Sequence, residues 1–220
     1  MKMRAEVKAK KILTAEDREH AFAVIEAVYR NEKQWIQSSS AEIPADIAGR
    51  QDQSWFLVAV DGEPAGVIRL VYDPPLEMPA EYGVTLEEGI DLEGLKRHGR
   101  FVDIGRFMIL PKYRRNIRVV MKLMRAAIVE VVERGYTHFL TDVFENDPHS
   151  PLRFHTQVLG FERIGTHQYG DLACASLRII LILDIARAYQ RLKKRENKVW
   201  KELGEGVRDV MEDRLPALTA

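Results

Sequence analysis

Residues 101–124 combine a predicted strand, a cationic loop and the start of a long helix. Between positions 112 and 125 the chain carries six basic residues and no acidic one. A helix N-terminus offers unpaired backbone N–H groups and a partial positive charge, and guanidinium groups add bidentate hydrogen bonds. The stretch therefore predicts a phosphate or pyrophosphate site at Arg114, Arg115 and Arg118. The alternative is a solvated basic turn with no ligand.

Other chemistries are disfavoured by the residues available. His149 and His155 are six positions apart, not the four of a helical zinc pair. Cys174 is the single cysteine, so neither a disulfide framework nor a site of several thiolates can form within the chain. No Gly-x-Ser-x-Gly nucleophile motif occurs. We therefore expect no metal site and no serine nucleophile of that type.

The charges balance in total but not along the chain. The 220 residues include 33 basic and 33 acidic side chains, yet three segments (1–11, 112–125 and 187–201) hold 18 of the bases and 2 of the acids. A neutral sum thus does not exclude a local anion site. The composition, 46% hydrophobic and 30% charged, is that of a globular chain. The longest strongly apolar run, Ile179 to Leu183, is too short for a membrane span, and MKMRAEVKAKK resembles no secretory signal. We expect a cytoplasmic protein.

The elements that must position these residues follow from periodicity and turn signals. Thr14 and Asp17 form a capping box that predicts a helix from Ala15. Asp61-Gly62 joins two β-rich runs into a hairpin. Further expected elements are a loop with a short helix over 76–98, strands at 101–110, 136–144, from 160 and at 175–183, and helices at 117–134, 151–158 and 184–203. This order predicts an α/β or α+β domain with a mixed sheet.

Two segments resemble the GNAT acyltransferases: ILPKYRR (109–115) before the long helix, and VLGFERIG (158–165) after the short one. The resemblance covers residues 12–185, and implies that the basic loop and helix hold the pyrophosphate of a pantetheine thioester. Backbone N–H groups around Met108–Leu110 would stabilise the oxyanion. Ile117 and Val119 stand where that family usually has small residues, and glycine is what lets a backbone approach phosphate closely.

A second resemblance, to the acyl-homoserine-lactone synthases and N-acyl amino acid synthases, accommodates that departure. Asp103-Ile-Gly-Arg-Phe is similar to their Glu-x-Ser-Arg-Phe strand, and Gly66-Val-Ile-Arg-Leu to their Gly-x-x-Arg-Leu strand. Val28, Tyr29 and Trp35 have the spacing of a third motif of these families, Val-Phe…Trp, although Ile25 stands where an arginine is expected. Residues 146–161 resemble the end motif of the N-acyl amino acid synthases, with His155 in place of tyrosine. Their shared order makes the set more specific than any one match.

The resemblance implies direct attack of an amine on a thioester carbonyl, which requires a base and oxyanion donors. Asp103 is the candidate base or ammonium anchor; alternatively it only forms a salt bridge with Arg69 or Arg106. Arg106 could bind a substrate carboxylate or complete that ion pair. His155 could act as an acid or proton relay, or be a surface histidine, and Glu145 could act through water or be merely exposed.

Further residues are expected to bind the acceptor substrate and the thioester donor. Substrate contacts are expected from Arg69, Trp35 and His149, although for His149 shaping its turn is the alternative role. The expected donor-binding set is Met108, Leu110, Arg114, Arg115, Asn116, Ile117, Arg118 and Val119. We expect no permanently bound cofactor; acyl-CoA or an acyl carrier protein would supply the thioester as co-substrate.

The sequence is compatible with three functions. The first is an N-acyltransferase acting on the amine of an amino acid or a related small metabolite. The others are a conventional acetyl-CoA N-acetyltransferase and an inert ligand-sensing module. The expected organisation is a basic tail (1–11), a GNAT-like domain (12–185) and a basic amphipathic C-terminal helix and tail (186–220). A carrier protein and a second copy of the chain are candidate partners; nucleic acid is not expected.

Overall fold

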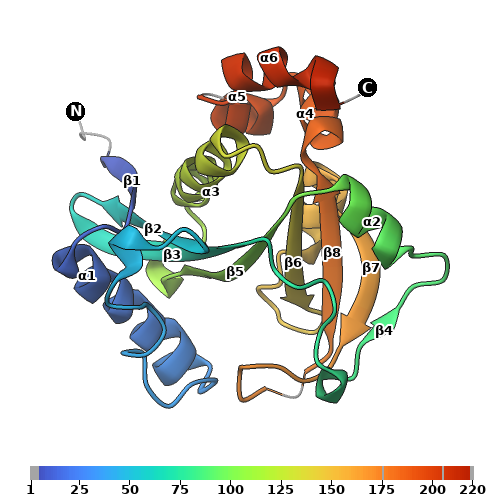
Figure 1. Cartoon of the computed structure of the whole chain (residues 1–220). Helices are drawn as coiled ribbons and strands as arrows, with labels where there is room; N and C mark the ends of the chain where they lie inside the picture. Colours follow the sequence, from blue (N-terminus) through green and yellow to red (C-terminus); the bar gives the residue numbers. More distant parts are fainter. Residues whose placement is uncertain (1–4, 175, 205, 219–220) are drawn as a thin grey trace.

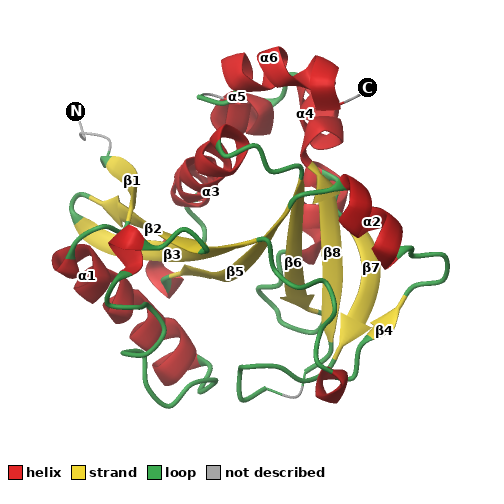
Figure 2. Cartoon of the chain, viewed as in Figure 1, coloured by secondary structure: helices red, strands yellow, loops and turns green. Residues whose placement is uncertain are grey.

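The computed structural model describes residues 5–174, 176–204 and 206–218. In this part of the chain, eight strands form one mixed sheet in the order β1-β2-β3-β5-β6-β8-β7-β4 (Figures 1 and 2). The strands are β1 (Val7–Lys11), β2 (Gln53–Val60), β3 (Glu63–Tyr72), β4 (Thr85–Leu86), β5 (Phe101–Ile109), β6 (His138–Phe144), β7 (Glu162–His167) and β8 (Arg178–Asp184). The expected mixed sheet is thus confirmed.

Helices cover both faces of the sheet. They are α1 (Ala15–Ile25) with its continuation η1 (Glu26–Glu32), η2 (Ile47–Gly49), η3 (Ala80–Tyr82), α2 (Leu92–His98), η4 (Pro111–Tyr113), α3 (Ile117–Glu133), η5 (Phe154–Leu159), α4 (Ile185–Arg195), α5 (Lys198–Gly204) and α6 (Arg208–Leu218). Helix α3 and the C-terminal helices lie on one face, and α1 lies on the other (Figure 1). The segment 73–100 packs Leu76, Met78 and Leu95 on the α1 side, against Phe101 and Ile180.

The local signals that predicted these elements act as expected. Thr14 and Asp17 cap α1 reciprocally, with the Asp17 N–H donating to Thr14 Oγ1 at 3.1 Å. The turn at Asp61-Gly62 has positive φ at both residues and closes the β2–β3 hairpin. Helix α3 begins at Ile117 behind its cap residue Asn116.

Strands β5 and β6 separate partway along their length. They pair in parallel only from Phe101 opposite His138 to Ile104 opposite Thr141. Strand β5 then continues to Ile109 beside β3, and β6 continues to Phe144 beside β8. The sheet therefore opens into a V-shaped gap between the ends of these two strands.

Two expectations about the ends of the chain were wrong. The segment 1–11 is not all tail, because Val7–Lys11 pairs with β2 as an edge strand. The expected helix over 184–203 is two helices: Glu196 has a positive φ of 44° and ends α4. Asn197 then starts α5 by accepting a 3.0 Å hydrogen bond from the Trp200 N–H.

Glu130 joins α3 to the sheet. Its Oε1 accepts hydrogen bonds from Ser54 Oγ at 2.6 Å, Tyr72 OH at 2.8 Å and Lys11 Nζ at 2.9 Å. We expect Glu130→Ala to lower the free energy of unfolding by about 3 kcal/mol, because buried donors lose a charged acceptor. Urea unfolding measures this effect. Exposed Glu19→Ala is the control, and an equal loss in both variants would contradict the role of Glu130.

Candidate active site

A cavity of about 940 Å³ lies at the V-shaped gap. Its lining comes from both faces of the sheet: Asp103 and Asp142 face α1 and the 73–100 segment, whereas Val120 of α3 and Phe154 lie on the opposite side. Strands β5 and β6 stay unpaired where the two groups meet. A ligand can therefore reach through the sheet at this point, from the α3 side to the α1 side.

Strand alternation places two groups of side chains on the α1 face, and their positions along the strands divide this side of the cavity into two parts. The polar half is Arg69, Asp103, Asp142, His167 and Arg178, and the apolar half is Phe101, Leu140, Ile164, Ile180 and Ile182. The apolar half is covered by Leu76, Met78, Val84 and Leu95. The cavity thus offers a polar compartment next to a hydrophobic one.

Asp103 and Arg69 face each other loosely in the polar half. Their closest atoms, Asp103 Oδ2 and Arg69 Nη2, are 3.9 Å apart, which is an ion pair but not a hydrogen bond. Burial raises the pKa of Asp103 to about 6, and the nearby charge of Arg69 only partly opposes this. A hydrogen-bonded ion pair would lower that pKa and make Asp103 a weaker base at neutral pH. The loose contact instead leaves a carboxylate suited to accept a proton near neutrality.

Arg106 has a different partner from the one expected. It occupies an irregularity in the β3–β5 ladder with a φ of 52°, and its Nε donates to Glu42 Oε2 at 2.7 Å. The guanidinium also lies 5.7 Å from the ring centre of Tyr29. Arg106 therefore completes an ion pair with Glu42 and not with Asp103. Glu42 was missed because it lies in a polar connection with no recognisable motif.

A second polar group joins β6, β7 and β8. Asp142 Oδ2 lies 3.1 Å from His167 Nε2 and 3.4 Å from Arg178 Nη1. Burial alone would raise the pKa of Asp142, but hydrogen bonding and charge from His167 and Arg178 outweigh it and lower that pKa. Asp142 is therefore ionised at neutral pH. This group could not be predicted from local motifs, because its members are up to 36 residues apart.

His155 is not the surface histidine that one interpretation expected. It is 4% exposed, lines the cavity on the α3 side and packs 4.9 Å from the Phe161 ring. Its Nδ1 lies 3.0 Å from the Pro151 carbonyl, so Nδ1 carries the proton of the neutral ring. Burial lowers the pKa of His155. The ring is therefore neutral at pH 7 and is a poor proton donor.

Three other expected residues differ from one another in whether they reach the cavity. Trp35 lines the cavity, with its ring 5.3 Å from Tyr29 and 4.3 Å from Phe144. His149 is exposed at the rim, where its N–H donates to Asp147 Oδ1 at 2.7 Å. Glu145 is exposed and is not among the described residues that line the cavity. The structure therefore brings Trp35 and His149, but not Glu145, to the site.

The basic loop lies at the α3 edge of the cavity. Arg114 is fixed by Glu32, at 2.8 and 2.5 Å, and by the Ile109 carbonyl at 3.1 Å. Asn116 Oδ1 accepts a hydrogen bond from the Arg118 N–H. Arg115 and Ile117 are exposed, whereas Val119 is buried in the core. Arg114 thus orders the loop, and the exposed Arg115 remains available to an anion.

The backbone edge of β5 identifies one candidate oxyanion donor. The Leu110 N–H donates to the Ala65 carbonyl at 2.9 Å and is therefore occupied. In an antiparallel ladder, N–H groups alternate between the two sides of the strand. Met108 and Leu110 accordingly face β3, and the N–H of the intervening Ile109 faces the gap. Within the expected range Met108–Leu110, the N–H of Ile109 is therefore the candidate donor to a ligand, whereas that of Leu110 is already bonded.

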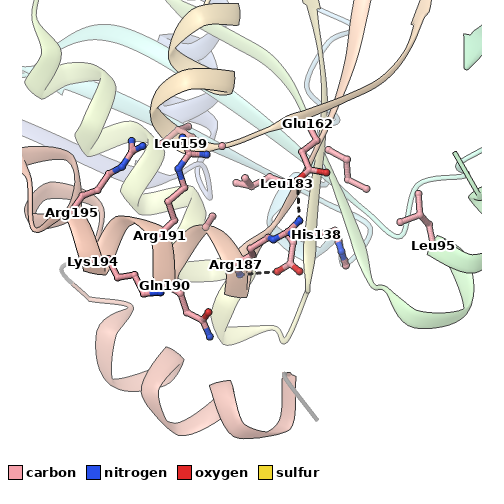
Figure 3. Close-up of a pocket in the computed structure, with 14 residues that line it drawn as sticks. Leu95, His138, Leu159, Glu162, Leu183, Arg187, Gln190, Arg191, Lys194 and Arg195 are labelled. Atoms are coloured by element: carbon pink, nitrogen blue, oxygen red, sulfur yellow. Dashed lines mark hydrogen bonds and ion pairs between the residues drawn. The ribbon is translucent and has the colours of Figure 1, made fainter. Parts of the chain in front are cut away.

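Figure 3 shows a second cavity, of about 660 Å³, beside α4. It is lined by the basic side chains of Arg187, Arg191, Lys194 and Arg195, and Arg187 pairs with Glu162 at 3.0 Å (Figure 3). None of the expected catalytic or donor-binding residues lines it. Among the described residues, Leu95 and Ile182 line both cavities, so the second cavity lies behind the apolar half of the first.

No group of three or more histidine, cysteine, aspartate or glutamate side chains in the described ranges could hold a metal ion. No described helix combines the length and hydrophobicity needed to cross a bilayer.

Comparisons with known proteins agree with this geometry. A family model described as N-acyl amino acid synthase FeeM matches residues 20–177. A search of curated protein sequences found no significant match. The structure of FeeM, an N-acyl amino acid synthase from uncultured soil microbes, is 14% identical and superposes with a TM-score of 0.64, covering 85% of this chain and 95% of that one.

Two acetyltransferase structures share the same fold. The aminoglycoside acetyltransferase AAC(6')-Ib in complex with coenzyme A is 16% identical, with a TM-score of 0.55 over 86% of this chain and 99% of that one. A putative GNAT-family acetyltransferase from Desulfovibrio desulfuricans is 12% identical, with a TM-score of 0.52 over 81% and 99%. At these identities the structural matches show the GNAT fold alone.

Proposed function

Because the chain belongs to the FeeM family of N-acyl amino acid synthases and is an N-acyltransferase, we propose that it transfers a long acyl chain to the amine of an amino acid. The donor would be the thioester of acyl-CoA or of an acyl carrier protein. The observation that carries this proposal is the two-part cavity, in which ionisable groups lie beside a hydrophobic compartment. An N-acyl amino acid has the same division, with a charged head and an apolar chain.

The proposed reaction uses groups that meet at the V-shaped gap. Asp103 takes a proton from the substrate ammonium, and the free amine attacks the thioester carbonyl. The Ile109 N–H stabilises the oxyanion of the tetrahedral intermediate. The C–S bond then breaks as the intermediate collapses, and Asp103 gives its proton to the leaving thiolate. The regenerated Asp103 carboxylate takes the second proton from the amide nitrogen and releases it to solvent. His155 is not assigned the acid role, because its buried ring is neutral.

The apolar half of the cavity argues against an acetyl group as the acyl group that the enzyme normally transfers. An acetyl group has one methyl to bury, whereas five large apolar side chains of the sheet and the 73–100 segment enclose this compartment. A longer chain buries more apolar surface there, at about 0.8 kcal/mol per CH₂. The conventional acetyl-CoA acetyltransferase thus becomes the outcome to be excluded by experiment.

Mass spectrometry of organic extracts from expressing cells tests the proposal. We expect a new long-chain N-acyl amino acid in cells with the wild-type protein and none in cells with Asp103→Asn. Only N-acetylated amines would favour the conventional acetyltransferase. If purified protein also fails to turn over any thioester, the inert sensing module gains support and the proposal is overturned.

Ile182→Trp tests the apolar half. Ile182 lines the end of this compartment, so a larger side chain should shorten it. We expect kcat/KM for a hexadecanoyl donor to fall about tenfold, because a pocket discriminates by small differences in chain volume. Octanoyl transfer should be little affected. Ile182→Ala should shift the preference toward longer chains, and parallel losses for all donors would contradict this role.

A further inference from the structure

Arg178 is a buried cation whose protein partners do not satisfy it. Its side chain is 5% exposed, and within the described part of the chain its one carboxylate contact is Asp142 at 3.4 Å, an acceptor also used by His167. Its Nε and Nη2 have no hydrogen-bond partner among the described residues. Buried guanidinium N–H groups without acceptors are costly, so such a group in a cavity wall calls for an anionic ligand.

The surroundings of Arg178 hold it in place. The guanidinium lies 4.9 Å from the ring centre of Phe144, which is a cation–π contact. On another side the backbone passes so close that a Cβ at Gly170 would lie 2.8 Å from Nη1. Arg178 is therefore fixed beneath the 168–174 loop.

The other arginines of the cavity are less suited to bind an anion. Arg106 already has a close carboxylate, Glu42 at 2.7 Å. Arg69 also has a buried Nε without a partner among the described residues, but it lies 3.9 Å from Asp103, so an anion bound there would crowd the carboxylate that must act as base. Arg178 lies on β8 and Asp103 on β5, and these two strands flank β6 from opposite sides. Both side chains line the cavity, so they can approach an acceptor above β6 from opposite sides.

We propose that Arg178 binds the carboxylate of the amino acid acceptor and so directs its amine toward Asp103. This inference rests on the proposed function and specifies how the acceptor is recognised. Binding requires the covering loop to admit the carboxylate, because Nε and Nη2 are shielded from solvent in the unliganded protein. The bound carboxylate would accept the N–H groups that now lack partners.

The test compares an amino acid with its carboxamide, which keeps the amine and the side chain. The probe is the amino acid identified in the cell extracts, assayed with a dodecanoyl thioester. We expect Arg178→Gln to raise KM for the amino acid about 30-fold, the range of a lost charge-assisted interaction. KM for the carboxamide should stay near its wild-type value. The KM of Arg178→Lys for the amino acid should lie between those of the wild type and Arg178→Gln. Arg178→Lys also gives the same comparison if Arg178→Gln does not fold.

Arg163→Gln is the matched control, because Arg163 pairs with Glu87 at 2.6 Å and is not among the described residues that line the cavity. A wild-type enzyme that acylates acid and carboxamide equally well would overturn the inference. Equal KM increases for both acceptors in the Arg178 variants would also overturn it, since a purely structural role has that effect. Acylation of amines but of no amino acid would instead refute the proposed function itself.

Discussion

Asp103→Asn should lower kcat for acyl transfer about 1,000-fold while leaving the affinity for the thioester donor nearly unchanged. The amide cannot take a proton from the substrate ammonium, but it occupies the same volume beside Arg69. Steady-state kinetics with a dodecanoyl donor and the preferred amino acid measure the loss. Asp46→Asn is the matched control, because Asp46 is exposed and its ion pair with Arg50, at 3.9 Å, lies outside the cavity.

The pH dependence tests the same residue independently. Asp103 acts as a base only when ionised, and its pKa is raised to about 6. The rate should therefore fall as the pH drops through about 6, and reach a plateau above it. The free energy of unfolding depends on pH in the opposite direction to the rate. A raised carboxyl pKa favours the folded state at low pH, and that stabilisation is lost as the pH rises through about 6. Asp103→Asn should therefore raise the free energy of unfolding, and the gain should be larger at pH 8 than at pH 5, because the variant has no carboxyl group to ionise. An unchanged pH–rate profile in the variant would contradict the role of Asp103.

Reversing the charge of both Arg115 and Arg118 should raise the donor KM about 100-fold and weaken its dependence on salt. Arg115 is exposed at the start of α3, where a phosphate of the donor would meet the helix N-terminus. Arg114 is left intact, because its hydrogen bonds to Glu32 order the loop. The preferred amino acid should keep its KM, and kcat should change little.

The double variant Lys8→Glu and Arg97→Glu changes the net charge equally. Both residues are largely exposed, at 74% and 63%, and neither lines the main cavity. We expect this control to bind the donor normally. If it loses affinity as strongly as the loop variant, the loop is only one part of a general electrostatic attraction.

Local signals were enough to predict most of the fold. The capping box at Thr14, the Asp61-Gly62 turn and the apolar face of α3 each depend on residues close in sequence. The break at Glu196 could not be predicted, because the apolar spacing continues through it and a glutamate at positive φ has no sequence signal. Strand β1 was missed because its lysines dominate a pattern with one strongly buried apolar residue, Val7.

The site was predicted where a resemblance supplied the positions, and missed where the pairing is long-range. Arg69 and Asp103 come together because their strands are neighbours and their motifs were recognised. Glu42 and Arg178 carry no motif and acquire their importance only when the sheet and the connection after α1 are in place. The looseness of the Arg69–Asp103 contact, which sets the pKa of Asp103, depends on packing that no spacing reveals.

The most direct test of the account is a competition between acetyl and dodecanoyl thioesters for the same amino acid. Purified protein receives equal concentrations of both donors, each supplied as the CoA ester and on a carrier protein, and mass spectrometry quantifies the two N-acyl products. The two-part cavity predicts that the dodecanoyl product dominates with at least one donor form. Predominance of the N-acetyl product with both forms would contradict it.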